Sequence, residues 1–233
     1  MRQLLLLVLL VPFTLTAQPH AEFWSKLSAV KLINSHWSFG IDVQYRQQAN
    51  YRKGDKNILH YPMGRSVSSW IYYSLKDQWQ IILSPAGWFK NEDISNNNDD
   101  LIETTELRHV IGTSKTVEIR RIKNKNRLLI EIRFIDFDKS NYNKQARYRM
   151  QNSLTIPLHK KEKLAGLNYY FSNELFIKKQ KSITRFDQNR VYNALQWKFK
   201  HTDVVLGYQW VVQQSASNTF HRHQLLIILN LYL

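Results

Sequence analysis

The chain has 233 residues, with 33 Lys and Arg against 18 Asp and Glu, a formal net charge of +15 and no cysteine. The lack of cysteine excludes a disulfide framework and any cysteine-based metal or redox site. Hydrophobic residues make up 43% of the chain. This is the composition of a folded domain, while the single long apolar run excludes a helical membrane protein with several spans.

That apolar run occupies residues 4–11, after Arg2, and is followed by an exit that contains Pro12, Thr14, Thr16 and Ala17. A cation, an apolar stretch and a small-residue exit in this order predict a secretory signal peptide over residues 1–17. A buried or anchoring helix is the alternative, but the run is short and Pro12 interrupts it. We therefore expect residues 18–233 to form a single exported domain.

After the signal, the dominant period is two, in segments of the roughly ten residues that a tilted transmembrane β-strand needs. In residues 37–46 one face is apolar throughout and consists of Trp37, Phe39, Ile41, Val43 and Tyr45. Similar segments, some less regular, follow at residues 65–75, 79–89, 104–122, 127–134, 145–156, 167–177, 190–199, 204–213 and 225–231. Asn152 is an exception on the apolar face of its segment.

The connections between these segments alternate in length. The long polar ones are residues 47–64, 90–103, 138–144, 178–189 and 214–221, and the short ones are 76–78, 123–126, 159–163 and 200–203. A soluble sandwich has no reason to alternate in this way, whereas outer-membrane barrels combine short periplasmic turns with longer external loops. The pattern predicts an all-β fold, an antiparallel transmembrane β-barrel with ten strands from Trp37 to Leu233 and both ends periplasmic.

Residues 18–36 are open to two interpretations, an additional short strand or a periplasmic segment. Bacterial barrels have even strand numbers, and one more strand would make the count odd. We therefore expect ten to twelve strands.

Several short segments of this pattern resemble a family of exported Gram-negative proteins called domain of unknown function 2490. The segments are Glu106-Leu107-Arg108, Glu131-Ile132-Arg133-Phe134, Arg147-Tyr148-Arg149, Ile156-Pro157-Leu158, Ser172-Asn173-Glu174-Leu175-Phe176, Asn189-Arg190 and Leu206-Gly207-Tyr208. The resemblance covers most of the chain from Trp24 onward and implies an outer-membrane β-barrel without assigned chemistry. It supplies no catalytic residues, and the 7 glycines of this sequence are fewer than in many barrels.

The inward faces of the predicted strands carry many charges. The candidate lumen network consists of Arg46, Arg108, Glu131, Arg133, Arg147, Arg149, Glu174 and Arg190, and Glu106, Glu118, Arg120 and Arg127 share the same faces. One interpretation is a lumen that binds or passes an anion, because confined arginines concentrate negative charge. The other is a plug of interstrand salt bridges, which we favour because small barrels are filled by side chains.

The sequence contains no catalytic constellation that we recognise. Glu131 and Glu174 could form a carboxylate pair of the glycosidase kind, but we expect each to meet an arginine. His221 and His223 lie two apart on one strand face and could share a metal if a neighbour supplied a third ligand, although contact with headgroups or a loop explains them better. We therefore expect no enzyme activity, no metal and no cofactor.

These observations predict an integral outer-membrane barrel with an arginine-rich, largely filled lumen. Its role would be structural or binding, or a narrow channel for small anionic solutes. Outer-membrane lipid, lipopolysaccharide and the barrel-insertion machinery are the expected partners, and export makes nucleic acid an unsuitable one despite the basic charge. The alternatives are an outer-membrane enzyme acting on lipid or lipopolysaccharide, and a soluble periplasmic β-barrel binder.

Overall fold

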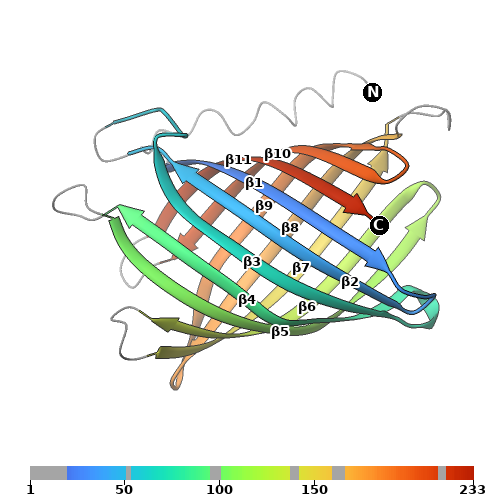
Figure 1. The fold of residues 1–233 in the computed structure, drawn as a ribbon, viewed down its shortest axis with the longest axis horizontal. Helices are drawn as coiled ribbons and strands as arrows, with labels where there is room; N and C mark the ends of the chain where they lie inside the picture. The colour runs from blue at the N-terminus through green and yellow to red at the C-terminus, as the bar shows by residue number, and fades with distance from the viewer. Residues whose placement is uncertain (1–19, 51–53, 95–100, 137–141, 159–165, 215–218) are drawn as a thin grey trace.

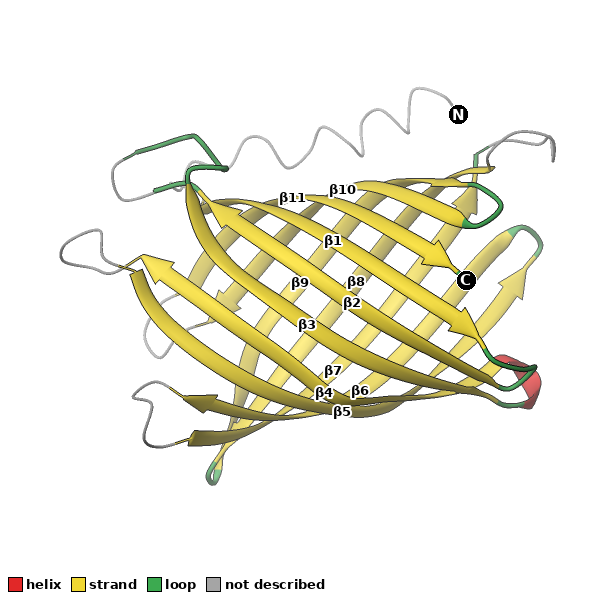
Figure 2. Ribbon diagram, viewed as in Figure 1, coloured by secondary structure: helices red, strands yellow, loops and turns green. Residues whose placement is uncertain are grey.

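The computed structural model describes residues 20–50, 54–94, 101–136, 142–158, 166–214 and 219–233. The expected signal peptide, residues 1–17, lies outside them. The described residues form one closed β-barrel (Figures 1 and 2). Its strands are β1 (His20–Leu32), β2 (Trp37–Gln48), β3 (Tyr61–Ser74), β4 (Trp79–Ile94), β5 (Leu101–Ile119), β6 (Ile122–Asp136), β7 (Tyr142–Pro157), β8 (Gly166–Gln180), β9 (Ile183–Lys198), β10 (Thr202–Gln214) and β11 (Thr219–Tyr232), with the short 3-10 helix η3 (Lys76–Gln78) before β4.

The barrel closes by pairing its first strand with its last. Consecutive strands are antiparallel, but β1 and β11 run parallel, with Leu27 opposite Leu229. The chain reverses at each hairpin, so an odd number of strands brings the last one to the seam in the direction of the first. The predicted antiparallel barrel and its range of ten to twelve strands are confirmed; the even number that supported the ten-strand interpretation is not found, and the odd number makes the closing pair parallel.

Residues 20–32 form the additional strand that the sequence leaves open, and this changes where the barrel begins. His20 starts β1 at the end of the barrel opposite to Leu233 (Figure 1). The prediction of ten strands from Trp37 placed both ends of the barrel domain together; with β1 added, the described chain enters the barrel at the end opposite to Leu233. The short connections after β1, β3, β5 and β9 still lie together at the end that carries the C-terminus.

Two predicted connections are strands instead. The sequence predicts a long loop over residues 178–189, but β8 continues to Gln180 and β9 begins at Ile183. A register shift between Phe176 and Ile177 interrupts the regular alternation here, which makes the stretch resemble a loop in sequence. Residues 123–126 belong to β6, and the turn before it is formed by Arg120 and Arg121.

Alternation sorts the side chains of each strand between the lumen and the outer face, as predicted. On β2, the outward Ile41 is 57% exposed and the inward Asp42 only 8%. On β6, the outward Leu128 is 54% exposed, whereas the inward Glu131 is completely buried. No helix in the described part of the chain is long and apolar enough to cross a membrane.

Small apolar clusters help to fill the lumen. Leu129, an apolar residue on the inner face of β6, packs with Ile82 and Val110. Gly112 lies so close to the backbone of Leu128 that a side chain there would collide with it. This close approach explains the glycine, since only a residue without Cβ fits. A second cluster, around Tyr192, is built from residues of β9, β10 and β11.

Candidate functional site

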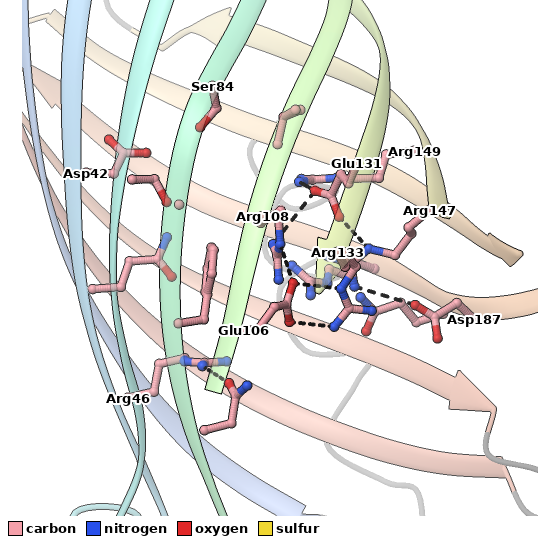
Figure 3. Close-up of a pocket in the computed structure, with 18 of the residues that line it drawn as sticks. Asp42, Arg46, Ser84, Glu106, Arg108, Glu131, Arg133, Arg147, Arg149 and Asp187 are labelled. Carbon is pink, nitrogen blue, oxygen red and sulfur yellow. Dashed lines mark hydrogen bonds and ion pairs between the residues drawn. The ribbon is translucent and has the colours of Figure 1, made fainter. Parts of the chain in front are cut away.

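The barrel encloses a cavity of about 530 Å³ to which all its strands contribute side chains. Its lining is predominantly polar, and a group of charged residues dominates the part formed by β5 to β9 (Figure 3). We call this group the charge cluster. It consists of Glu106, Arg108, Arg127, Glu131, Arg133, Arg147, Arg149, Glu174, Lys178, Asp187 and Arg190.

Glu131 on β6 is the centre of the charge cluster. Its Oε2 accepts a hydrogen bond from Arg147 Nε at 2.6 Å, and its Oε1 accepts one from Arg149 Nη1 at 2.5 Å. Arg147 is the direct cross-strand partner of Glu131 on β7, so the register itself creates the first of these pairs. Arg108 Nη1 approaches Oε1 from the other side at 3.7 Å.

Glu106 on β5 relieves a repulsion that the register imposes. Arg108 and Arg133 stand directly opposite each other on β5 and β6, and like charges in such positions are destabilising. Glu106 accepts a hydrogen bond from Arg108 Nε at 2.7 Å and one from Arg133 Nη2 at 2.7 Å. One buried carboxylate therefore holds both guanidinium groups.

Arg149 connects the two carboxylates that the sequence suggests as a pair. Its Nη1 binds Glu131, and its Nη2 binds Glu174 Oε1 at 2.7 Å. Arg127 Nη2 contacts the same oxygen of Glu174 at 3.3 Å. Glu131 and Glu174 thus each meet arginines, as expected.

Lys178 and Asp187 extend the charge cluster through a stretch that resembles a loop in sequence. Lys178 Nζ lies 2.8 Å from Asp187 Oδ1, and Arg147 Nη1 lies 3.5 Å from Asp187 Oδ2. Sequence reasoning missed both residues, because their segment lacks the regular alternation of the other strands. The charges of their side chains are visible in the sequence, but their inward direction is not.

The charge cluster contains more cations than anions. Six arginines and Lys178 face four carboxylates, which leaves a surplus of three positive charges. Arg190 is the cross-strand partner of Glu174, but within the described residues it makes no hydrogen bond and no ion pair within 4 Å, and its Nε is buried without a partner. Its guanidinium instead lies 4.6 Å from the ring of Phe176 and 5.6 Å from that of Trp24.

Aromatic rings support the guanidinium groups of the lumen, and sequence reasoning did not assign them this role. Phe176 is completely buried, and Arg147 and Arg149 lie 5.1 and 4.9 Å from its ring centre. Phe89 lies 3.8 Å from the guanidinium carbon of Arg108. Such contacts favour a desolvated cation. An aromatic residue on the polar side of a strand is the signal that could have identified Phe176.

Arg46 is the predicted network residue that lies apart from the charge cluster. It stands across the cavity, where its Nη2 donates to Asn91 Oδ1 at 2.5 Å (Figure 3). Asp42 lies on the same side and binds Lys26 Nζ at 2.8 Å. The structure brings together the other seven predicted residues, namely Arg108, Glu131, Arg133, Arg147, Arg149, Glu174 and Arg190.

Other residues considered from the sequence lie elsewhere. Glu118 and Arg120 are exposed at the β5–β6 hairpin, so their expected place in the lumen network is wrong. His221 stacks on Trp210, and His223 hydrogen bonds to the hydroxyl of Tyr208. Within the described ranges, no group of three or more His, Asp or Glu side chains is arranged to hold a metal ion.

The fold and the lumen together define a closed eleven-stranded β-barrel with a salt-bridged interior. The model of the family described as protein of unknown function (DUF2490) matches residues 21–222, and the chain belongs to this family. Among solved structures, the fold is similar to the β-domain of the Bordetella autotransporter Brka, with a TM-score of 0.52 and 8% identity over 84% of this chain and 82% of that one. No curated protein matches the sequence.

Proposed function

We propose that this protein is an integral outer-membrane barrel whose lumen binds small anionic solutes and provides a narrow path for them. The membrane location is supported by the outer face. Outward apolar side chains such as Ile41, Met150 and Leu225 are 57%, 56% and 49% exposed. An apolar band of this kind matches the lipid-facing surface of a transmembrane barrel. Lipid and lipopolysaccharide are then its surroundings, and the barrel-insertion machinery assembles it.

The positive surplus of the charge cluster is the observation that carries the anion proposal. Its paired arginines are held by carboxylates, but Arg190 keeps a guanidinium without an ion pair in the described structure, beside the cavity. A confined cavity with surplus cations attracts anions. Carboxylate and phosphate groups suit a guanidinium in particular, because both accept two parallel hydrogen bonds from it.

Binding or conduction is also favoured over catalysis. The central carboxylates Glu106, Glu131 and Glu174 each accept hydrogen bonds from arginine. A general acid or base needs a carboxyl group that can exchange a proton with its substrate. The proposal therefore assigns the charge cluster to holding the barrel together and attracting an anion.

The test is conductance of the detergent-refolded protein in a planar bilayer, with a salt gradient to give ion selectivity. We expect small, anion-selective currents and a lower anion preference in Arg190→Gln. Arg121→Gln, which removes the same charge from the exposed β5–β6 turn, is the matched control and should leave selectivity unchanged. Cation selectivity, or equal effects of both variants, would contradict the anion proposal.

The membrane location has a separate test. Envelope membranes are washed with urea or high salt without detergent, and the protein is followed in the pellet and the supernatant. We expect it to stay in the membrane and to migrate differently on a gel when boiled and unboiled. Release by urea alone would instead indicate a soluble periplasmic binder.

A further inference from the structure

The outer face of β6 to β9 carries asparagines within its apolar surface. They are Asn124, Asn126, Asn152, Asn173, Asn189 and Asn193, and we call them the amide patch. On β2, by contrast, the outward residues from Trp37 to Tyr45 are all apolar. The sequence pattern singles out Asn152 alone, and three of the others fall in predicted connections, Asn124 and Asn126 in residues 123–126 and Asn189 in residues 178–189.

The amide patch is continuous across the strands. Asn126, Asn152 and Asn173 are successive cross-strand partners on β6, β7 and β8. Asn152 Nδ2 donates to Asn126 Oδ1 at 2.7 Å and to Asn124 Oδ1 at 3.1 Å. The order of the strands therefore gathers these amides into one surface.

The β8–β9 part of the amide patch is joined in the same way. Asn173 Nδ2 donates to Asn189 Oδ1 at 3.0 Å. On β9, Asn189 and Asn193 stand on either side of Val191. Tyr169 donates its hydroxyl proton to Asn193 Oδ1 at 2.5 Å.

Asn152 and Asn173, at the middle of the amide patch, lie away from the ends of their strands. Asn152 lies between the outward Met150 and Leu154, and Asn173 lies between Phe171 and Leu175. Apolar residues on both sides place these amides within the apolar band rather than at its edge.

Internal hydrogen bonds do not use the full capacity of these amides. Each offers two N–H donors and an oxygen with two lone pairs. In the described structure, Nδ2 of Asn124 and Nδ2 of Asn193 make no hydrogen bond. Hydrocarbon supplies neither donors nor acceptors, so polar groups left without partners in the membrane are costly.

We propose that the amide patch is the interface through which two copies of this barrel pair side by side, an inference that rests on the membrane location proposed above. Asparagine amides both donate and accept, so the amide patch is complementary to itself. A two-fold axis places the same surface on both partners. Anionic headgroups fit less well, because the amides carry no charge, and a second copy brings donors and acceptors in equal measure.

Cross-linking tests the position of the interface, and the lack of cysteine in the chain makes single cysteines specific probes. Leu175→Cys lies beside the amide patch and leaves its amides intact, whereas Val43→Cys lies on the apolar face of β2. When the variants are inserted in liposomes and an oxidant is added, we expect disulfide-linked dimers from Leu175→Cys and few from Val43→Cys. Equal yields, or no dimers from either variant, would overturn the interface.

A second experiment tests the amides themselves by single-molecule counting of labelled barrels in liposomes. The double variant Asn152→Leu with Asn173→Leu should weaken dimerisation by about tenfold, as expected when a few hydrogen bonds within a membrane are lost. Ser25→Leu on the outer face of β1 is the matched control and should leave it unchanged.

The outcomes separate this inference from the proposed function. An inserted barrel that conducts anions but stays monomeric overturns the interface alone. Dimers that persist in the double variant, or pairing with another protein in place of a second copy, overturn it as well. Release of the protein by urea without detergent overturns both the interface and the membrane location.

Discussion

The lumen and the outer face are built from alternate residues of the same strands, yet they accommodate polar groups differently. In the lumen, opposite charges from neighbouring strands pair, as Glu131 does with Arg147 and Arg149. On the outer face, most side chains are apolar, and the amide patch is neutral. In this barrel, therefore, the direction of a side chain decides which chemistry is stable at its position.

Removal of the central carboxylate should have the largest effect on stability. In Glu131→Gln, the buried Arg147 and Arg149 lose their shared anion, so we expect the free energy of unfolding to fall by about 3–5 kcal/mol. Urea unfolding of the refolded protein measures this. Glu118→Gln, at an exposed ion pair with Lys123, is the control and should change it by less than about 1 kcal/mol. Equal losses would contradict the central role of Glu131.

A charge on the outer face tests whether that face meets lipid. Ile227 is 43% exposed on β11. Replacement by arginine should destabilise the inserted barrel by about 2–4 kcal/mol if the residue lies near the bilayer midplane. The yield of heat-modifiable protein and its unfolding in liposomes report the effect, with Ile227→Val as the control. Normal folding and insertion of Ile227→Arg would contradict contact between this face and lipid.

A substitution on the side of the lumen opposite the charge cluster should lower the free energy of unfolding by a smaller amount. Asp42 accepts hydrogen bonds from Ser28 and Trp70 and pairs with Lys26. Asp42→Asn keeps the shape and part of the hydrogen bonding, so we expect a loss of about 1–2 kcal/mol in the same urea assay. A loss as large as that of Glu131→Gln would remove the distinction between the two sides.

Arg190 should matter least for stability. It forms no ion pair in the described structure and contacts the rings of Phe176 and Trp24. Because its loss also relieves repulsion from neighbouring arginines, Arg190→Gln should change the free energy of unfolding by no more than about 1 kcal/mol. A large destabilisation would show that Arg190 is a structural residue rather than a spare cation.

For most strands, the sequence predicts which side chains point into the lumen and which point outward, because the alternation of polar and apolar residues alone decides this. The outward Ile41 and inward Asp42 are an example. The parallel pairing of β1 with β11 could not be predicted. Whether the number of strands is odd or even depends on whether residues 20–32 pair with β11. The register shift near Ile177 likewise hides the end of β8 and the beginning of β9.

The sequence predicts the candidate site as a set of inward charges but not as a network. Which carboxylate meets which arginine depends on register and strand order. Arg149, for example, joins Glu131 on β6 to Glu174 on β8. Arg46 also points inward but lies across the cavity from the charge cluster. The alternation within one strand gives the direction of a side chain and not its distance from residues of other strands.

The reversal potential of the refolded barrel in a planar bilayer under a salt gradient is the sharpest test of an anion-attracting lumen. The surplus of positive charge predicts a potential of the sign that anion flow produces, and a shift toward zero in Arg190→Gln. A cation-selective potential, or an anion preference that Arg190→Gln leaves unchanged, would contradict this role of the lumen.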